Sequence, residues 1–145
     1  MSDNRASKVT VSFVVPGQPV GQGRPRFTSR GLFPHAVDPP KSRQYKNLVK
    51  RLAHDAYQGE PLDGPIKIHL VHCFEIPKSY SKKRKKACLE GIERPTKKPD
   101  IDNVYKGIAD AMSGVIYCDD KQVVEDSQEQ WYAPEPCVKV YVTQI

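Results

Sequence analysis

The chain has 145 residues, a formal net charge of +6 and a pI of about 9.1. This length has room for a single domain, residues 1–145, and excludes a catalytic domain beside a separate binding domain. The basic charge favours nucleic acid as a partner, and the lack of a signal segment and of about 18 consecutive apolar residues predicts a cytoplasmic protein without a membrane partner.

The N-terminal part of the chain predicts a strand, a long loop and a helix. Residues 9–15 are rich in β-branched and aromatic side chains and stop at a Pro-Gly pair, which is typical of a strand that ends in a turn. Residues 16–40 are rich in proline, glycine and arginine and predict a long irregular loop. Residues 41–57 place apolar side chains at helical spacing, and Gly59 ends this helix.

The middle of the chain predicts one strand and two helices. Residues 66–76 alternate apolar and polar side chains and predict a strand that ends at Pro77. Residues 79–89 are rich in lysine with few apolar side chains, so we expect a helix on the surface. Residues 101–112 predict an amphipathic helix that ends at Gly114.

The C-terminal segments predict strands. Residues 115–117 can form a short strand, and residues 122–132 and 137–143 predict a closing β-hairpin. Together the elements favour an α/β fold of the α+β type, in which one two-layer domain packs a mixed β-sheet against two or three helices.

The predicted helix over residues 101–112 has two different faces. Asp102, Lys106 and Asp110 follow one another at intervals of four residues and share one side of the helix. The other side is apolar and predicts a core contact, made by Ile101, Val104, Ile108, Ala111 and Met112.

Two pairs of carboxylates flank this helix. Asp100 and Asp102 stand at its start, where a carboxylate can cap free backbone N–H groups, and Asp119 and Asp120 follow a short apolar run, where Asp is also common in turns. These structural roles are an alternative for each acid taken alone. A cluster of three or four carboxylates implies a compensating cation, and all-oxygen ligands favour Mg²⁺ or Mn²⁺.

Lys106 stands one helical turn beyond Asp102 on the same side. The structural alternative is an ordinary i,i+4 ion pair worth a few tenths of a kcal/mol. A functional lysine at this place could stabilise negative charge on a pentavalent phosphate or orient the attacking water. Carboxylates, a metal ion and one lysine suffice for phosphodiester hydrolysis without a covalent nucleophile.

The segment Lys98-Pro-Asp-Ile-Asp-Asn-Val-Tyr-Lys106, followed by Asp119-Asp-Lys-Gln-Val123, resembles the RusA family of Holliday-junction resolvases. A weaker similarity extends to the Gly/Pro/Arg-rich segment of residues 16–26, which resembles phage-type or prophage-type members. The resemblance implies a small homodimeric endodeoxyribonuclease that binds four-way DNA junctions. It further implies paired nicks with Mg²⁺ or Mn²⁺ in DNA recombination and repair, in a bacterial or phage-infected cell.

The resemblance also implies roles for individual residues. Asp100, Asp102 and Asp120 match the family's essential, metal-binding carboxylates, Lys106 matches its catalytic lysine, and Asp119 matches the accompanying acid. Where some members place arginines before the first aspartate, this chain has Lys97-Lys98-Pro99, which keeps the charge without the planar fork of a guanidinium.

Basic residues are concentrated before the acidic motif. Residues 78–98 carry nine basic and two acidic side chains, whereas residues 99–145 carry three basic and nine acidic ones. A solvated face is the alternative for such a run, and a mobile loop without fixed contacts is the alternative for the earlier arginines. Beside a nuclease site we expect phosphate contacts. The candidate nucleic-acid-binding residues are Arg24, Arg26, Arg30, Lys82, Lys83, Arg84, Lys85, Lys86, Lys97 and Lys98.

Two other functions remain open from the sequence. The charge alone fits a non-catalytic protein that binds junctions or RNA, and Asp-x-Asp also occurs in Mn²⁺-dependent nucleotide-sugar enzymes, whose nucleotide fold this length barely accommodates. The histidines point to no further metal site, because His69 and His72 fall on opposite faces of their predicted strand, so we interpret both as structural.

Overall fold

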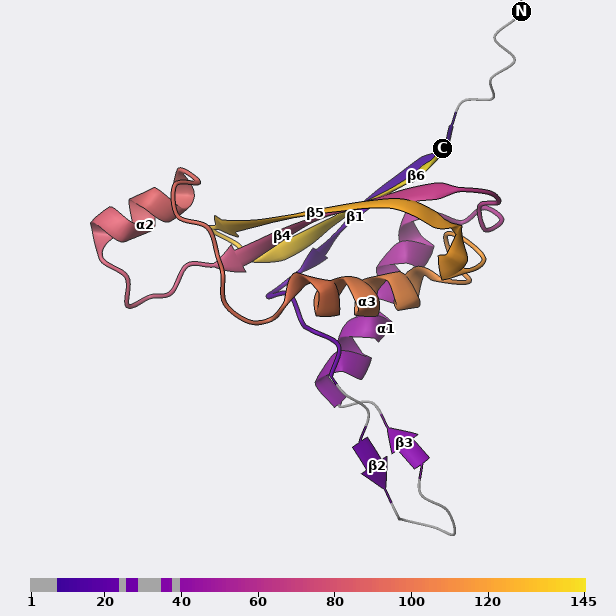
Figure 1. Cartoon of the computed structure of the whole chain (residues 1–145), viewed down its shortest axis with the longest axis horizontal. Helices are drawn as coiled ribbons and strands as arrows, with labels where there is room; N and C mark the ends of the chain where they lie inside the picture. The colour runs from indigo at the N-terminus through magenta and orange to yellow at the C-terminus, as the bar shows by residue number, and fades with distance from the viewer. Residues whose placement is uncertain (1–7, 24–25, 29–34, 38–39) are drawn as a thin grey trace, which may run out of the picture.

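The computed structural model describes residues 8–23, 26–28, 35–37 and 40–145. Its order of elements confirms the α+β class, with a mixed four-stranded sheet and three α-helices in the described ranges (Figure 1). In chain order the elements are β1 (Thr10–Pro16), β2 (Arg26–Thr28), β3 (His35–Val37), α1 (Pro40–Ala56), β4 (Ile66–Glu75), α2 (Lys82–Leu89), α3 (Ile101–Met112), the short 3₁₀ helix η1 (Asp120–Gln122), β5 (Val123–Ala133) and β6 (Cys137–Gln144).

The sheet has the strand order β1-β6-β4-β5, with β4 parallel to β5 and antiparallel to β6. The predicted hairpin between the last two strands is therefore wrong, because β4 lies between β5 and β6. Burial explains the order. The helix-facing side chains of β4 include Ile66, Ile68 and Leu70, all fully buried, and such a strand needs neighbours on both sides. The more polar β5 can lie at the edge.

Helices α1 and α3 cover one face of the sheet (Figure 1). Helix α3 has the predicted bounds, and its apolar side is buried as expected except for Ile101, which is half-buried. Val104, Ile108 and Met112 have no exposed surface. Each such side chain contributes about 1.5–3 kcal/mol relative to an exposed one, so this core fixes the angle at which α3 presents its polar side.

Residues 113–122 connect α3 to β5 by turns. The predicted strand over residues 115–117 is wrong, because this segment makes only two isolated bridges through Tyr117, to Leu62 and to Ser113. Tyr117 is fully buried, and its hydroxyl donates a hydrogen bond of 2.5 Å to the carbonyl of Ala109. Packing against the end of α3, rather than sheet pairing, therefore holds the turn that carries Asp119.

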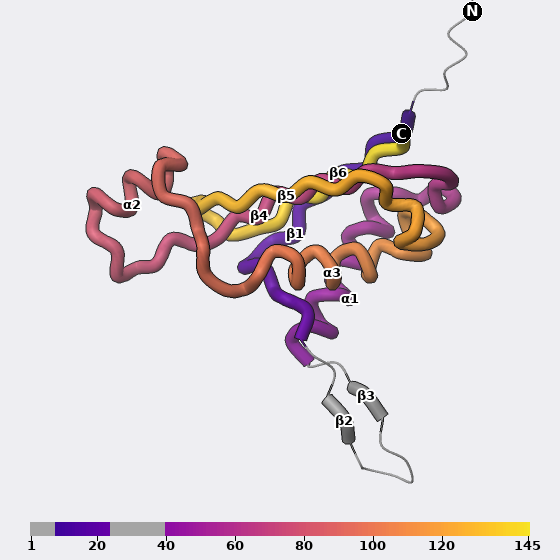
Figure 2. The backbone as a smooth tube through the Cα atoms, in the orientation of Figure 1, coloured from indigo at the N-terminus to yellow at the C-terminus, as the bar shows by residue number. Residues whose placement is uncertain are grey.

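The segment before α1 contacts the helices. The Gln22 N–H donates to the Asn103 carbonyl at 3.1 Å, and the Gly23 N–H donates to the Ser42 hydroxyl at 3.1 Å. Figure 2 shows this segment running from β1 past the start of α3. Residues 16–23 are irregular as predicted, but β2 and β3 pair as a separate two-stranded sheet within the range predicted as loop.

Helix α2 lies beyond the ends of β4 and β5, apart from the other two helices (Figure 1). Ser81 caps its N-terminus by accepting a hydrogen bond from the Arg84 N–H, and Cys88 is its one buried residue. The prediction of a surface helix is confirmed, although the helix begins at Lys82 instead of residue 79. No helix in the described ranges is long and apolar enough to span a membrane.

Candidate active site

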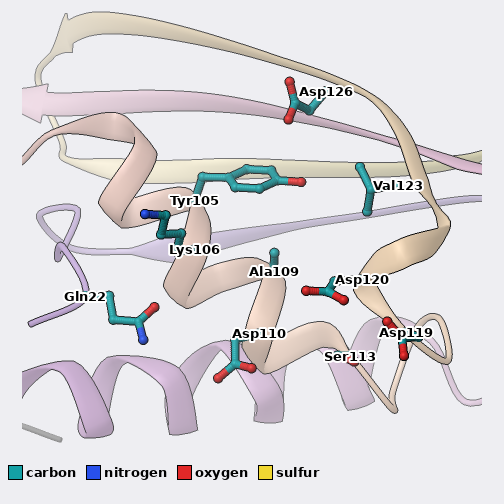
Figure 3. Close-up of a pocket in the computed structure, with 10 residues that line it drawn as sticks. All are labelled: Gln22, Tyr105, Lys106, Ala109, Asp110, Ser113, Asp119, Asp120, Val123 and Asp126. Carbon is teal, nitrogen blue, oxygen red and sulfur yellow. The ribbon is translucent and has the colours of Figure 1, made fainter. Parts of the chain in front are cut away.

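A cavity of about 600 Å³ lies between α3, the turn before β5, and β5 itself. Figure 3 shows the side chains that face it. They combine four acids with one lysine, one amide and one phenol: Asp110, Asp119, Asp120, Asp126, Lys106, Gln22 and Tyr105. Lys106 from the helix and the Asp119-Asp120 pair from the turn therefore meet in one cavity. Asp100 and Asp102, at the start of the helix, are not among the residues that line it.

The edge strand β5 forms the polar wall of this site. Asp126 pairs in register with Ile68, and Gln128 pairs with Leu70, so both polar side chains lie on the sheet face that carries the core. Gln128 Nε2 donates to Asp102 Oδ1 at 3.2 Å. In Figure 3 the Tyr105 ring extends from α3 towards β5, between Asp126 and Asp120. The polar sides of α3 and β5 thus face each other.

Lys106 makes no ion pair within the described ranges, and Asp102 lies outside ion-pair distance of it. The i,i+4 pair considered as the structural alternative is therefore not formed. Asp102 instead accepts a hydrogen bond from Gln128. Lys106 thus lines the acidic cavity without an ion pair to any carboxylate of the described residues.

Asp110 differs from Asp102 in the element that it contacts. Its carboxylate lies 3.0 Å from Lys46 Nζ on α1, whereas the carboxylate of Asp102 contacts β5. Residues four apart on an α-helix differ by about 40° in direction. Over the two intervals from Asp102 to Asp110 this difference doubles, so the two side chains face different elements.

Each acidic pair contains one capping residue. Asp100 Oδ1 accepts from the Asp102 N–H at 2.9 Å at the start of α3. Asp119 Oδ1 accepts from the Lys121 N–H at 2.9 Å, in a capping box with Gln122. The structure thus confirms the capping roles that were considered as alternatives for Asp100 and Asp119. Asp102 and Asp120 are exposed acids without such a capping role, one in each pair.

The charges at the turn influence one another. The hydrogen bond from the Lys121 backbone lowers the pKa of Asp119, while the neighbouring Asp119 carboxyl raises the pKa of Asp120. Burial, followed by the negative charges of Asp126 and Asp120, raises the pKa of Tyr105 to about 12. The cavity is thus an environment that disfavours further negative charge and favours a cation.

The donor set fits a hard divalent cation. The described residues contain no group of three His, Cys, Asp or Glu side chains close enough to hold an ion by themselves. Mg²⁺ does not require such a group, since it keeps several waters and usually binds one or two carboxylates together with substrate phosphates. The exposed carboxylates of Asp102 and Asp120 offer this chemistry.

Four contributors to the site were not predicted: Gln22, Tyr105, Asp126 and Gln128. Gln22 follows the N-terminal strand by several residues, and its backbone hydrogen bond to the Asn103 carbonyl brings it to α3. A signal existed for two of the others. Asp126 and Gln128 alternate along β5 on the face towards the core, where an apolar residue is the norm.

The predicted nucleic-acid-binding residues have different surroundings. Arg24 and Arg30 lie outside the described residues, and Arg26 is described only as part of the β2 backbone. Arg84 makes a bidentate pair with Glu93, and its guanidinium carbon lies 3.6 Å from the centre of the Tyr80 ring. The remaining candidates are the α2 lysines Lys82, Lys83, Lys85 and Lys86, and the exposed Lys97 and Lys98 before α3.

Comparison with known proteins shows similarity over nearly the whole chain. Residues 16–143 match the sequence model of a protein family that is described as "Endodeoxyribonuclease RusA". The chain is also 39% identical over 137 residues to "Uncharacterized protein YqaN" of Bacillus subtilis (strain 168), an alignment that covers 93% of this chain and 96% of that protein. The matched range begins at the last residue of β1, includes every residue that lines the cavity, and ends one residue before the end of β6.

Proposed function

The chain belongs to the RusA family of endodeoxyribonucleases, and from this premise we propose that it is a Mg²⁺-dependent endonuclease that resolves four-way DNA junctions. It hydrolyses one phosphodiester bond in each of two opposing strands during DNA recombination and repair, with Mn²⁺ as a substitute cation. Its place of action is the cytoplasm of a bacterial or phage-infected cell.

The observation that carries this proposal is the uncommitted Lys106 at a cavity walled by carboxylates. A surface lysine beside acids normally forms ion pairs, which are worth little but are readily made. An ammonium group left free of them in the described structure is available to a phosphate group that enters the cavity. There it stabilises the negative charge that develops on the phosphate oxygens during hydrolysis.

Asp102 and Asp120, with Asp100 beside them, are the proposed ligands of the cation. A cation held by these residues would supply neutralisation of phosphate charge and a lowered pKa for a water. Asp100 has a second role. Its Oδ1 accepts a hydrogen bond from the Asp102 N–H, which holds the first turn of α3 and so fixes the position of Asp102. Asp119 orders the turn through its capping box and thereby positions Asp120.

The basic segments before α3 are the proposed DNA contacts. Lys97 and Lys98 precede Asp100 with only Pro99 between, so phosphates bound there lie close to the carboxylates in the chain. Helix α2, which carries the other candidate lysines, lies beyond the end of the sheet (Figure 1). Each phosphate that is neutralised releases counterions and adds affinity that falls with salt concentration.

We further propose that the active form is a homodimer. Resolution requires two nicks in opposing strands, and a two-fold symmetric protein presents two equivalent sites to them.

Incubation of the purified protein with an end-labelled four-way junction and with a matched linear duplex tests the function. We expect symmetric nicks in the junction with Mg²⁺, none with EDTA and none in the linear duplex. The Asp102→Asn variant should bind the junction without cleaving it, while the matched variant Asp55→Asn, at an exposed acid on α1, should cleave normally. Junction binding without nicks by the wild type under every metal tried would instead establish a non-catalytic binding protein.

A further inference from the structure

The carboxylate of Asp102 contacts a side chain that reaches into the core. Gln128 Nε2 donates to Asp102 Oδ1 at 3.2 Å, and Gln128 Oε1 lies 2.9 Å from His72 Nε2. The three residues come from α3, β5 and β4 respectively. They form one continuous chain of hydrogen bonds from the interior of the sheet to the acidic site.

His72 is unusual for its position. It is fully buried on the face of β4 that otherwise carries apolar side chains such as Leu70 and Phe74. Burial lowers its pKa, so the ring is neutral. Its Nδ1 is buried without a hydrogen-bond partner among the described residues, which costs about 1–3 kcal/mol. A Leu or Phe would serve the core better, so stability alone does not account for a histidine at this place.

The donors and acceptors allow one arrangement. The Gln128 carbonyl oxygen can only accept, so His72 must carry its proton on Nε2 and donate it. This bond fixes the orientation of the amide and directs its NH₂ group at Asp102. The opposite orientation would place the amide oxygen against the carboxylate. It would also require His72 to carry its proton on Nδ1, which is buried without an acceptor among the described residues.

The hydrogen bond from Gln128 fixes the orientation of the Asp102 carboxylate. Gln128 is the one side chain in the described ranges that is hydrogen-bonded to it, and the bond engages only Oδ1. Oδ2 is left for another ligand. Residues that hold a ligating group in place in this way commonly change metal affinity about 10–100-fold when they are replaced.

We propose that Gln128, held in orientation by the buried His72, is a positioning residue that presents Asp102 to the divalent cation. This inference rests on the proposed function, because it requires Asp102 to be a metal ligand. It adds two residues, on strands β4 and β5, to the machinery that the acidic motif and Lys106 make up.

The test is direct titration of Mn²⁺ into the protein without DNA, by isothermal titration calorimetry. Gln128→Leu removes both hydrogen bonds at similar size and should raise the Kd for Mn²⁺ about 10-fold or more. Gln58→Leu, at an exposed glutamine outside the site, is the matched control and should leave the Kd unchanged. The cleavage activity of Gln128→Leu should recover at high Mn²⁺ concentration, whereas metal-free binding of the junction should equal that of the wild type.

Substitutions of His72 separate positioning from simple packing. His72→Phe fills the core but releases the amide of Gln128, so it should raise the Kd for Mn²⁺ as Gln128→Leu does. His72→Gln can again donate to Oε1 and should restore most of the affinity. These variants also serve if Gln128→Leu does not fold.

The outcomes distinguish the two proposals. A wild type that cleaves junctions with Mg²⁺, together with a Gln128→Leu variant of unchanged Kd and unchanged metal requirement, would overturn the positioning role alone. A wild type that neither binds Mn²⁺ nor cleaves would overturn the proposed function and the positioning role with it. A rise in Kd for His72→Gln equal to that for His72→Phe would also count against the role, since the restored donor would then be irrelevant.

Discussion

Lys46 of α1 and Asp110 of α3 form an ion pair of 3.0 Å in which the lysine is largely covered, at 16% side-chain exposure, and the aspartate is open to solvent at 66%. The pair joins the two helices beneath the sheet at the edge of the acidic cavity. The Asp110 carboxylate is therefore paired with α1. The acids of the cavity whose charges act on Tyr105 are Asp126 and Asp120.

Replacing Asp110 by Asn should have a small effect on stability. Exposed ion pairs contribute about 0–1 kcal/mol, because solvent screens them. We expect Asp110→Asn to lower the free energy of unfolding by less than about 1 kcal/mol in urea denaturation. A loss above about 2 kcal/mol would contradict this and show that the pair contributes strongly to the packing of α1 against α3.

Two glycines should respond in opposite directions to replacement by alanine. Gly91 has a φ of +76°, and a Cβ there would lie 2.8 Å from Trp131 Cζ3, on a ring that the Arg94 guanidinium covers at 3.4 Å. Gly91→Ala should therefore lower the free energy of unfolding by more than about 1 kcal/mol.

Gly107 lies within α3, where a Cβ would approach nothing closer than Gln22 Cβ at 3.9 Å. Gly107→Ala should stabilise by up to about 1 kcal/mol through helix propensity. Urea denaturation of both variants checks the contrast, and equal signs would contradict it.

Acid should destabilise the fold through His72. Its pKa in the fold is lowered by burial from 6.5, so the unfolded chain takes up the proton first as the pH falls. The stability that neutral His72 contributes is fully present above pH 6.5 and is lost below it, at most about 1.4 kcal/mol per pH unit.

Measurement of the free energy of unfolding at intervals from neutral to mildly acidic pH tests this dependence. The wild type should lose more stability over this range than His72→Phe, which has no group to titrate there. Parallel curves for the two proteins would show that the decline comes from other groups. The carboxylates are common to both and do not affect the comparison.

The sequence predicted the elements whose signals are local. Helix α3 was predicted with its observed bounds, because the apolar spacing and the flanking Asp100 and Gly114 all lie within fifteen residues of one another. The pairing of β5 with β6 was predicted wrongly, because adjacency in the chain suggested a hairpin. The insertion of β4 between them depends on burial of its apolar face, which no short segment reveals.

The same distinction applies to the site. The spacing of Asp102 and Lys106 lies within one helix and could be seen directly in the sequence. Gln128 is 26 positions from Asp102, and His72 is 56 positions from Gln128, so their connection required the strand order. His72 was interpreted as structural because its strand periodicity showed only that it faces away from His69. Its single hydrogen bond became visible only in three dimensions.

The most direct measurement of the central claim is the single-turnover rate of junction cleavage by Lys106→Met with saturating Mg²⁺, compared with the wild type and with Asp55→Asn. If Lys106 stabilises charge on the reacting phosphate, the rate should fall about 10²–10³-fold while junction binding and Mn²⁺ affinity stay close to those of the wild type. A Lys106→Met variant that cleaves at the wild-type rate would contradict the assignment of this cavity as the active site.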